Sequence, residues 1–195
     1  MNCSSILIIC SSYVVLNHRN KKYRLDLSRN VIDNGIIIDN QLFSKAYLKF
    51  IKKNHTYNFW KKNSITIIYN VCNNRRDIEN LYHLFKELNY INIYLVEEKK
   101  LLNLKLSTNY LLVDKSIRLF YIDKYNQKKV LVLNPEILSN SEICKLIASR
   151  SSNRILNIVG DEDQKWNFPN LNYYVFDQLS EFFFEKYMSI SKDFD

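Results

Sequence analysis

Residues 64–100, which read SITIIYNVCNNRRDIENLYHLFKELNYINIYLVEEKK, decide the fold of this chain. The first part, 64–72, is apolar and rich in β-branched residues without helical spacing, which predicts a buried strand. A helical segment follows, and 91–96 has the pattern of a second strand. Strand, helix and strand at this spacing form a βαβ unit, so we expect a parallel sheet with a helix on its face.

The helix within this stretch carries one apolar stripe. Its members are spaced three or four residues apart: Ile78, Leu81, Phe85 and Leu88. We expect Asp77 to cap the N-terminus of this helix and Asn89 to end it.

Two carboxylates, Glu97 and Glu98, follow the second strand at its carboxyl end. Ligands in open α/β sheets usually bind at that edge. The pair is therefore a candidate for chemistry, with polar strand-end residues as the structural alternative.

Composition limits the classes of function. With 195 residues and 47% apolar side chains, the chain can form one domain or two small ones sharing a core. The net charge of +8 is compatible with nucleic acid or an anionic membrane surface, but the basic runs are short and dispersed, which favours solvated surface. The four cysteines lack metal-ligand spacing and predict reduced thiols in the cytoplasm. Two glycines cannot form a phosphate-binding P-loop or a GxGxxG loop.

Further apolar segments predict the rest of the fold. Strands are expected at 6–10, 13–16, 21–27, 109–114, 117–123, 129–133, 155–159 and 171–176, the first three as an antiparallel meander. Helices are expected from Asp39 or Asn40 to 51, from Pro135 to about 148, and from Leu179 onwards.

Four segments resemble bacterial MreB proteins of the actin-like ATPase superfamily. VIDNGIIIDNQLFSKAYLKFIKK (31–53) is similar to the family's "lrdGvIaDfe…mlryfikk" segment, and 64–98 to its strand–helix–strand ending "vflIEEP". NYLLVDKSIRLF (109–120) lies where the family has "nmvVDIGGGTtei", and RILNIVGD (154–161) where it has "givLTGGGA". The resemblance implies an α/β, RNase H-like mixed sheet with flanking helices. It also implies a shortened chain, with residues 1–134 as the first actin-like half and 135–195 as a truncated remnant of the second.

The resemblance also implies where ATP and Mg²⁺ would bind, and this chain departs from the family there. Ser11 and Ser12 replace the first phosphate loop, and Asp114 with Lys115 stands in the second, where only the Mg²⁺-associated Asp remains. Gly160 alone remains of the glycine-rich adenosine turn. Glu97 or Glu98 corresponds to the water-polarising carboxylate region. Loss of all three glycine-containing loops argues against nucleotide binding, so the carboxylates are interpreted as vestigial, with no cofactor and no metal.

The sequence therefore predicts a non-catalytic, MreB-like cytoskeletal or cell-shape protein that acts through protein–protein contacts. The partner would be a full-length actin-like protein or a second copy, in the cytoplasm or at the inner face of the membrane. One alternative is a minimal ATP-hydrolysing actin-like protein that uses Glu97, Glu98 and Asp114 with Mg²⁺. A second is a basic nucleic-acid-binding adaptor on an RNase H-like scaffold, although nucleic acid is the less favoured partner. A third is a folded remnant without a function.

Overall fold

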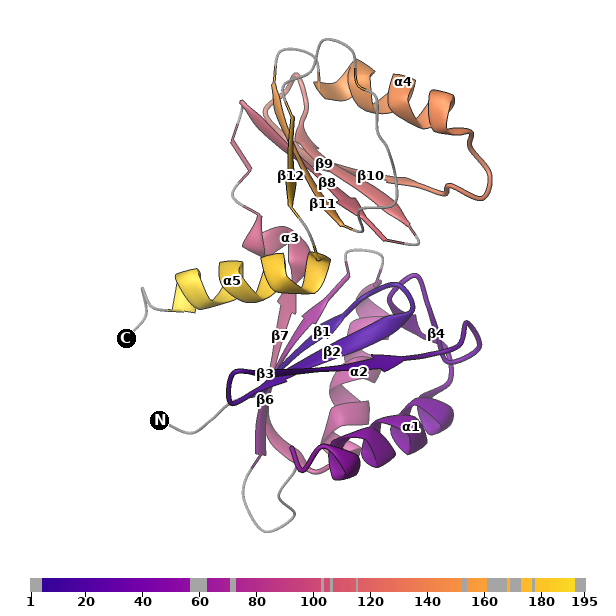
Figure 1. Ribbon diagram of the computed structural model, residues 1–195, viewed down its shortest axis with the longest axis vertical. Helices are drawn as coiled ribbons and strands as arrows, with labels where there is room; N and C mark the ends of the chain where they lie inside the picture. Colours follow the sequence, from indigo (N-terminus) through magenta and orange to yellow (C-terminus); the bar gives the residue numbers. More distant parts are fainter. Residues whose placement is uncertain are drawn as a thin grey trace. The chain divides into compact units, whose positions relative to one another are not determined.

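A computed structural model of the chain describes residues 5–56, 63–70, 73–102, 104–105, 107–114, 116–151, 154–160, 168, 173–176 and 178–191. The chain divides into two compact units, Met1–Lys100 and Leu101–Asp195. Each unit contains a five-stranded mixed sheet (Figure 1).

The sheet of the first unit has the order β3-β2-β1-β6-β7. Its strands are β1 (Ser5–Ile9), β2 (Tyr13–His18), β3 (Lys21–Asp26), β6 (Asn63–Tyr69) and β7 (Tyr90–Glu97). The first three form the predicted antiparallel meander, and β1, β6 and β7 are parallel to one another. The strands predicted at 64–72 and 91–96 are confirmed as a parallel pair, with bounds of Asn63–Tyr69 and Tyr90–Glu97. Residues 71 and 72 lie outside the described residues. A hairpin of two short strands, β4 (Ile32–Asp33) and β5 (Ile36–Ile37), precedes the first helix.

Two helices cover one face of this sheet, α1 (Asn40–Lys53) and α2 (Arg75–Glu87) (Figure 1). Their apolar faces enter a single core with the inward-facing residues of β1, β2 and β6. Within this core Tyr47 stacks on Phe43 and packs edge-on against Phe85, so the two helices are joined through aromatic rings.

The helix ends follow from local hydrogen bonds. Asp39 accepts bonds from the backbone N–H groups of residues 41 and 42 and caps α1, as the sequence predicted. The prediction for α2 was wrong by three residues, because Asn74 is the N-cap and Asp77 is the third helical residue. The two residues form a capping box: the side chain of Asn74 accepts from the backbone N–H of Asp77, and the side chain of Asp77 accepts from the backbone N–H of Asn74. Leu88 ends α2, and Asn89 adopts a left-handed conformation with φ 62° directly after it.

The sheet of the second unit has the order β10-β9-β8-β11-β12. Its strands are β8 (Thr108–Val113), β9 (Ile117–Ile122), β10 (Lys128–Leu133), β11 (Ile155–Gly160) and β12 (Tyr173–Phe176). The pattern repeats that of the first unit: two antiparallel hairpin pairs followed by two parallel strands. The mixed, RNase H-like sheet expected for the first half is therefore present in both units.

The strand pairing of the second sheet gives a different division of the chain from the one that the sequence predicted. The sequence predicted a boundary after Asn134, whereas the structure divides between Lys100 and Leu101. The physical reason is that β8 lies between β9 and β11, so residues on either side of Asn134 belong to one sheet. The predicted truncation of the second half is not confirmed, because the second unit has all five strands.

Two longer helices complete the second unit, α4 (Asn140–Ser151) and α5 (Leu179–Ser191), and a short α3 (Glu98–Leu101) follows β7. Pro135 does not begin α4, because residues 134–138 form a turn that Asn134 stabilises by accepting a bond from the N–H of Glu136. Ser139 and Glu142 instead bond reciprocally at the start of the helix, in the pattern of a capping box. Among the described residues, no helix is both long and apolar enough to cross a bilayer.

Candidate functional site

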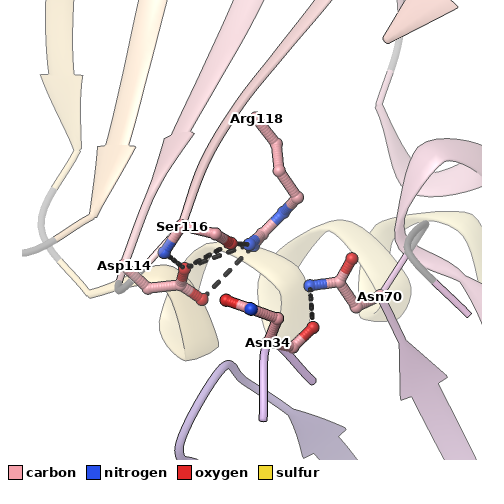
Figure 2. Close-up of polar contacts among 5 residues, drawn as sticks. All are labelled: Asn34, Asn70, Asp114, Ser116 and Arg118. Carbon is pink, nitrogen blue, oxygen red and sulfur yellow. Dashed lines mark hydrogen bonds and ion pairs between the residues drawn. The ribbon is translucent and has the colours of Figure 1, made fainter. Parts of the chain in front are cut away.

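The β8–β9 hairpin carries a buried cluster of three polar side chains, Asp114, Ser116 and Arg118 (Figure 2). Arg118 Nη1 donates to Asp114 Oδ1 over 3.0 Å, and Nη2 donates to Oδ2 over 3.3 Å. The backbone N–H and hydroxyl of Ser116 also donate to Oδ1, at 2.9 and 3.2 Å. Both carboxylate oxygens of Asp114 therefore accept hydrogen bonds from the protein itself.

This ion pair is almost fully removed from water. The side chain of Asp114 is 3% exposed and that of Arg118 is 1% exposed. Arg118 lies in β9, an inner strand of the sheet, between Leu112 of β8 and Val132 of β10. An isolated buried charge is costly, so the guanidinium and the carboxylate stabilise each other in this environment.

Gly160, at the end of β11, packs directly on β8. A Cβ atom at this position would lie 1.9 Å from the backbone oxygen of Val113, so only glycine fits. The close approach to β8 therefore explains this glycine by packing alone. Lys115, the other candidate in this hairpin, lies outside the described residues.

The equivalent hairpin of the first unit joins β1 to β2 and contains Ser11 and Ser12. Its backbone is closed by a bond from the N–H of Cys10 to the oxygen of Tyr13. The carbonyl of Ser11 accepts from the N–H of Gly35, and that of Ser12 from the N–H of Leu27. Ser11 is buried, and its main-chain oxygen is engaged within the unit.

Glu97 and Glu98 do not form a single paired site. Glu97 ends β7 and lies in register beside Tyr69, the last residue of β6. Burial raises the pKa of the Tyr69 phenol, and the nearby negative charge of Glu97 raises it further. Glu98 begins α3 and is buried, whereas Glu97 is half-exposed. Of the two, Glu97 is the carboxylate at the carboxyl edge of the sheet.

An asparagine cluster that the sequence analysis did not single out lies at the same edge. Asn34 and Gly35 form the turn of the β4–β5 hairpin, with φ of 48° and 77°. The amide of Asn70 donates to the carbonyl of Asn34 over 3.2 Å (Figure 2). Asn73 holds the next peptide, donating to the carbonyl of Gly35 over 3.2 Å. These bonds attach the hairpin to the carboxyl end of β6.

A small pocket of about 10 Å³ opens beside this cluster. That volume accommodates about one water molecule. Its lining comes from β1, the β4–β5 hairpin and the starts of α1 and α2: Ile9, Gly35, Ile37, Asn40, Asn73, Asp77, Asn80 and Leu81.

Metal ligation has little support in the part of the chain that the structure describes. No group of three or more His, Cys, Asp and Glu side chains there is arranged to hold an ion. Asp114, the position that the resemblance associates with Mg²⁺, contacts Arg118 instead. A carboxylate in a bidentate pair with a guanidinium has its oxygens directed at that partner.

Sequence reasoning missed Arg118, which determines the state of Asp114. A signal was present, because Arg118 is the only charged residue in the otherwise apolar run IRLFYI. A charge in a central strand requires a partner, and Asp114 is four residues away across a tight turn.

Two five-stranded sheets of the same mixed order, each with flanking helices, have the α/β arrangement of the actin-like fold. Solved structures with this fold are similar to the chain. MreB5 of Spiroplasma citri bound to ADP matches with a TM-score of 0.63 and 11% identity, over 100% of this chain and 98% of that one. The ethanolamine utilization protein EutJ from Carboxydothermus hydrogenoformans matches with a TM-score of 0.63 and 10% identity, over 88% and 84%.

A second structure of the Spiroplasma citri protein, MreB 5 bound to AMPPNP, matches with a TM-score of 0.48 and 12% identity. It covers 76% of this chain, which spans 58% of the MreB 5 chain in that match. No family model and no curated protein matches the sequence. The comparisons therefore establish the actin-like fold that the sequence resemblance implied.

Proposed function

We propose that this protein is a non-catalytic, MreB-like protein that acts through protein–protein contacts in the cytoskeleton or in cell shape. The observation that carries the proposal is the ion pair of Asp114 with Arg118 in the β8–β9 hairpin. The sequence resemblance aligns this hairpin with the second phosphate loop of actin-like ATPases. Asp114 is the acidic residue of that loop that this chain retains.

Phosphoryl transfer depends on positioning of the phosphates and on a metal ion held by oxygen ligands. In this hairpin the aspartate oxygens accept bonds from Arg118 and Ser116. A Mg²⁺ ion would have to displace the guanidinium, which would leave a buried cation without its counter-charge. Retention of the fold with this pair in place supports a role that does not require nucleotide chemistry.

Contacts with other proteins are the role that we propose for this scaffold. The proposed partner is a full-length actin-like protein or a second copy of this chain. The proposed location is the cytoplasm, including the inner face of the membrane, where a net charge of +8 favours anionic lipid.

Nucleotide binding is the second candidate function. One observation favours it: the chain shares its fold with MreB5, whose crystal structure contains ADP. In this alternative the chain binds the nucleotide through contacts other than those of Asp114.

Thermal unfolding with and without 5 mM Mg·ADP or Mg·ATP separates the two candidates. The proposal predicts no change in Tm beyond that caused by Mg²⁺ alone. A site with a Kd of about 50 μM would stabilise the protein by about 2.7 kcal/mol at this concentration. For a chain of this size that stabilisation would raise Tm by roughly 5–10 °C. A rise of this size would show that the chain binds nucleotide, which would support the second candidate and contradict a scaffold that acts without nucleotide.

The contact function has its own test, in which the purified chain is sedimented with assembled filaments of a full-length actin-like protein from the same cells. We expect co-sedimentation that does not require added nucleotide beyond that of the filament. A chain that stays in the supernatant at saturating filament concentration, and that is also monomeric alone, would contradict the proposal.

A further inference from the structure

Strand β7 forms an outer edge of the first sheet, and among the described residues no strand pairs with its outer side. An unpaired edge presents backbone N–H and C=O groups that another strand can use. We propose that β7 is a homodimer interface, in which β7 of a second copy adds antiparallel to it.

The two edges of this sheet differ in charge. The opposite edge, β3, carries four charged side chains within six residues: Lys21, Lys22, Arg24 and Asp26. Such charges protect an edge from pairing with another chain. From Tyr90 to Val96, β7 has no charged residue, no proline and no glycine, and Glu97 is its first charge.

The exposed side chains of β7 are two large apolar or aromatic ones, Ile91 and Tyr94, and one amide, Asn92, which donates to the hydroxyl of Ser64 over 3.2 Å. Ile93 and Leu95 pack against the core below α1 and α2, and Ile91 shares their face by alternation along the strand. Ile91 nevertheless remains 46% exposed. On the other face, Tyr94 is 58% exposed. A large exposed aromatic beside a free edge is typical of a contact surface.

The sequence of β7 can pair with itself in an antiparallel register without opposing like charges. With the two-fold axis at Ile93, Ile91 lies opposite Leu95 of the second copy, and Asn92 lies opposite Tyr94. Every directly opposed pair from Ile91 to Leu95 is then apolar or joins an amide to a phenol, and no like charges face each other. Shifting the axis by one residue, to Tyr94, would place Ile91 against the charged Glu97.

A second copy is the occupant that fits best. Each copy has a net charge of +8, so two copies repel each other overall, and the uncharged edge from Tyr90 to Val96 adds no like charge at the contact. Pairing about a two-fold axis also closes the assembly, because each copy uses its own β7 edge once. The result would be a continuous ten-stranded sheet.

Sedimentation velocity of the full chain at 1–100 μM tests the inference, with Ile91→Lys and Tyr94→Lys as variants. Each introduces two lysines into a two-fold interface. We expect the wild type to dimerise in this range and each variant to raise the dissociation constant by about tenfold or more. The matched control is Tyr125→Lys, the same replacement at a tyrosine that is 71% exposed in the β9–β10 turn, and it should leave dimerisation unchanged.

Cross-linking tests the register without relying on disruption. Opposed residues in antiparallel strands have Cα atoms about 4.5–5.5 Å apart, within disulfide range. Mixing Ile91→Cys with Leu95→Cys should therefore give a disulfide-linked dimer under mild oxidation, while neither variant alone exceeds the background of the native thiols. Circular dichroism confirms that each variant is folded.

A wild type that remains monomeric at 100 μM would overturn the inference, even if the edge then bound a strand of another protein. A dimer that both lysine variants leave intact, or that Tyr125→Lys weakens equally, would also overturn it. The inference rests on the proposed contact function, and the two can fail separately. A monomeric wild type overturns the β7 dimer, whereas the contact function fails only if the monomeric chain also stays out of the filament pellet.

Discussion

Replacing Arg118 with methionine should be among the most destabilising single changes in the second unit. Methionine keeps an unbranched apolar side chain in the sheet but removes the guanidinium from Asp114. The carboxylate, 3% exposed, would keep its two bonds from Ser116 and lose both bonds to Nη1 and Nη2. Breaking a buried ion pair in this way costs about 3–5 kcal/mol.

Urea unfolding followed by circular dichroism measures this loss in the free energy of unfolding. The matched control is Arg75→Met, because Arg75 forms an ion pair with Glu79 at the surface of α2, with side chains 93% and 58% exposed. A pair of that kind contributes about 0.5 kcal/mol or less. The contrast between the two variants isolates burial as the cause.

A double variant separates two costs of Arg118→Met: the lost packing of the arginine side chain and the unpaired, buried charge of Asp114. Asp114→Asn combined with Arg118→Met leaves no charge in the hairpin, so it should be more stable than Arg118→Met alone. If Arg118→Met lowers the free energy of unfolding by less than about 1 kcal/mol, or if the two single losses simply add, the interpretation of this pair is refuted.

Two further predictions concern glycines and one concerns pH. Gly160→Ala should destabilise the protein by about 3 kcal/mol or more in urea unfolding, because its Cβ would overlap the β8 backbone. Gly35→Ala, at φ 77° and 2.8 Å from a side-chain carbon, should lose less, about 1–2 kcal/mol, and an equal loss would contradict this ranking. Hydrogen bonds from the N–H groups of Gln127 and Tyr125 lower the pKa of Asp123 below 3.8, so its ionised form stabilises the fold above that pH. The Tm difference between wild type and Asp123→Asn should therefore be present at pH 6 and shrink as the pH falls below 3.8. A difference that is constant from pH 6 to pH 2.5 would contradict the assignment.

Local patterns in the sequence determined the elements of both units. The apolar stripe of 78–88 predicts α2 because helical periodicity depends on neighbours three and four residues apart. The meander β1–β3 follows from short apolar runs separated by tight turns. Asp39 as the cap of α1 needs only the residues that follow it. Each of these inferences uses interactions within a few residues.

Tertiary structure decided how those elements are combined and what the candidate carboxylates do. The place of β8 between β9 and β11 depends on pairing residues more than 40 positions apart, which periodicity does not encode, and it placed the division at Lys100. The residues around Asp114 in the sequence do not reveal whether its carboxylate binds a metal ion or an arginine. In the folded protein it is buried and paired with Arg118. The stretch 64–100 thus specified a parallel strand–helix–strand unit by itself. Only the assembled sheet showed that the last strand of this unit, β7, lies at an edge among the described residues. The position of a strand within a sheet depends on pairing between distant parts of the chain, which local sequence does not encode.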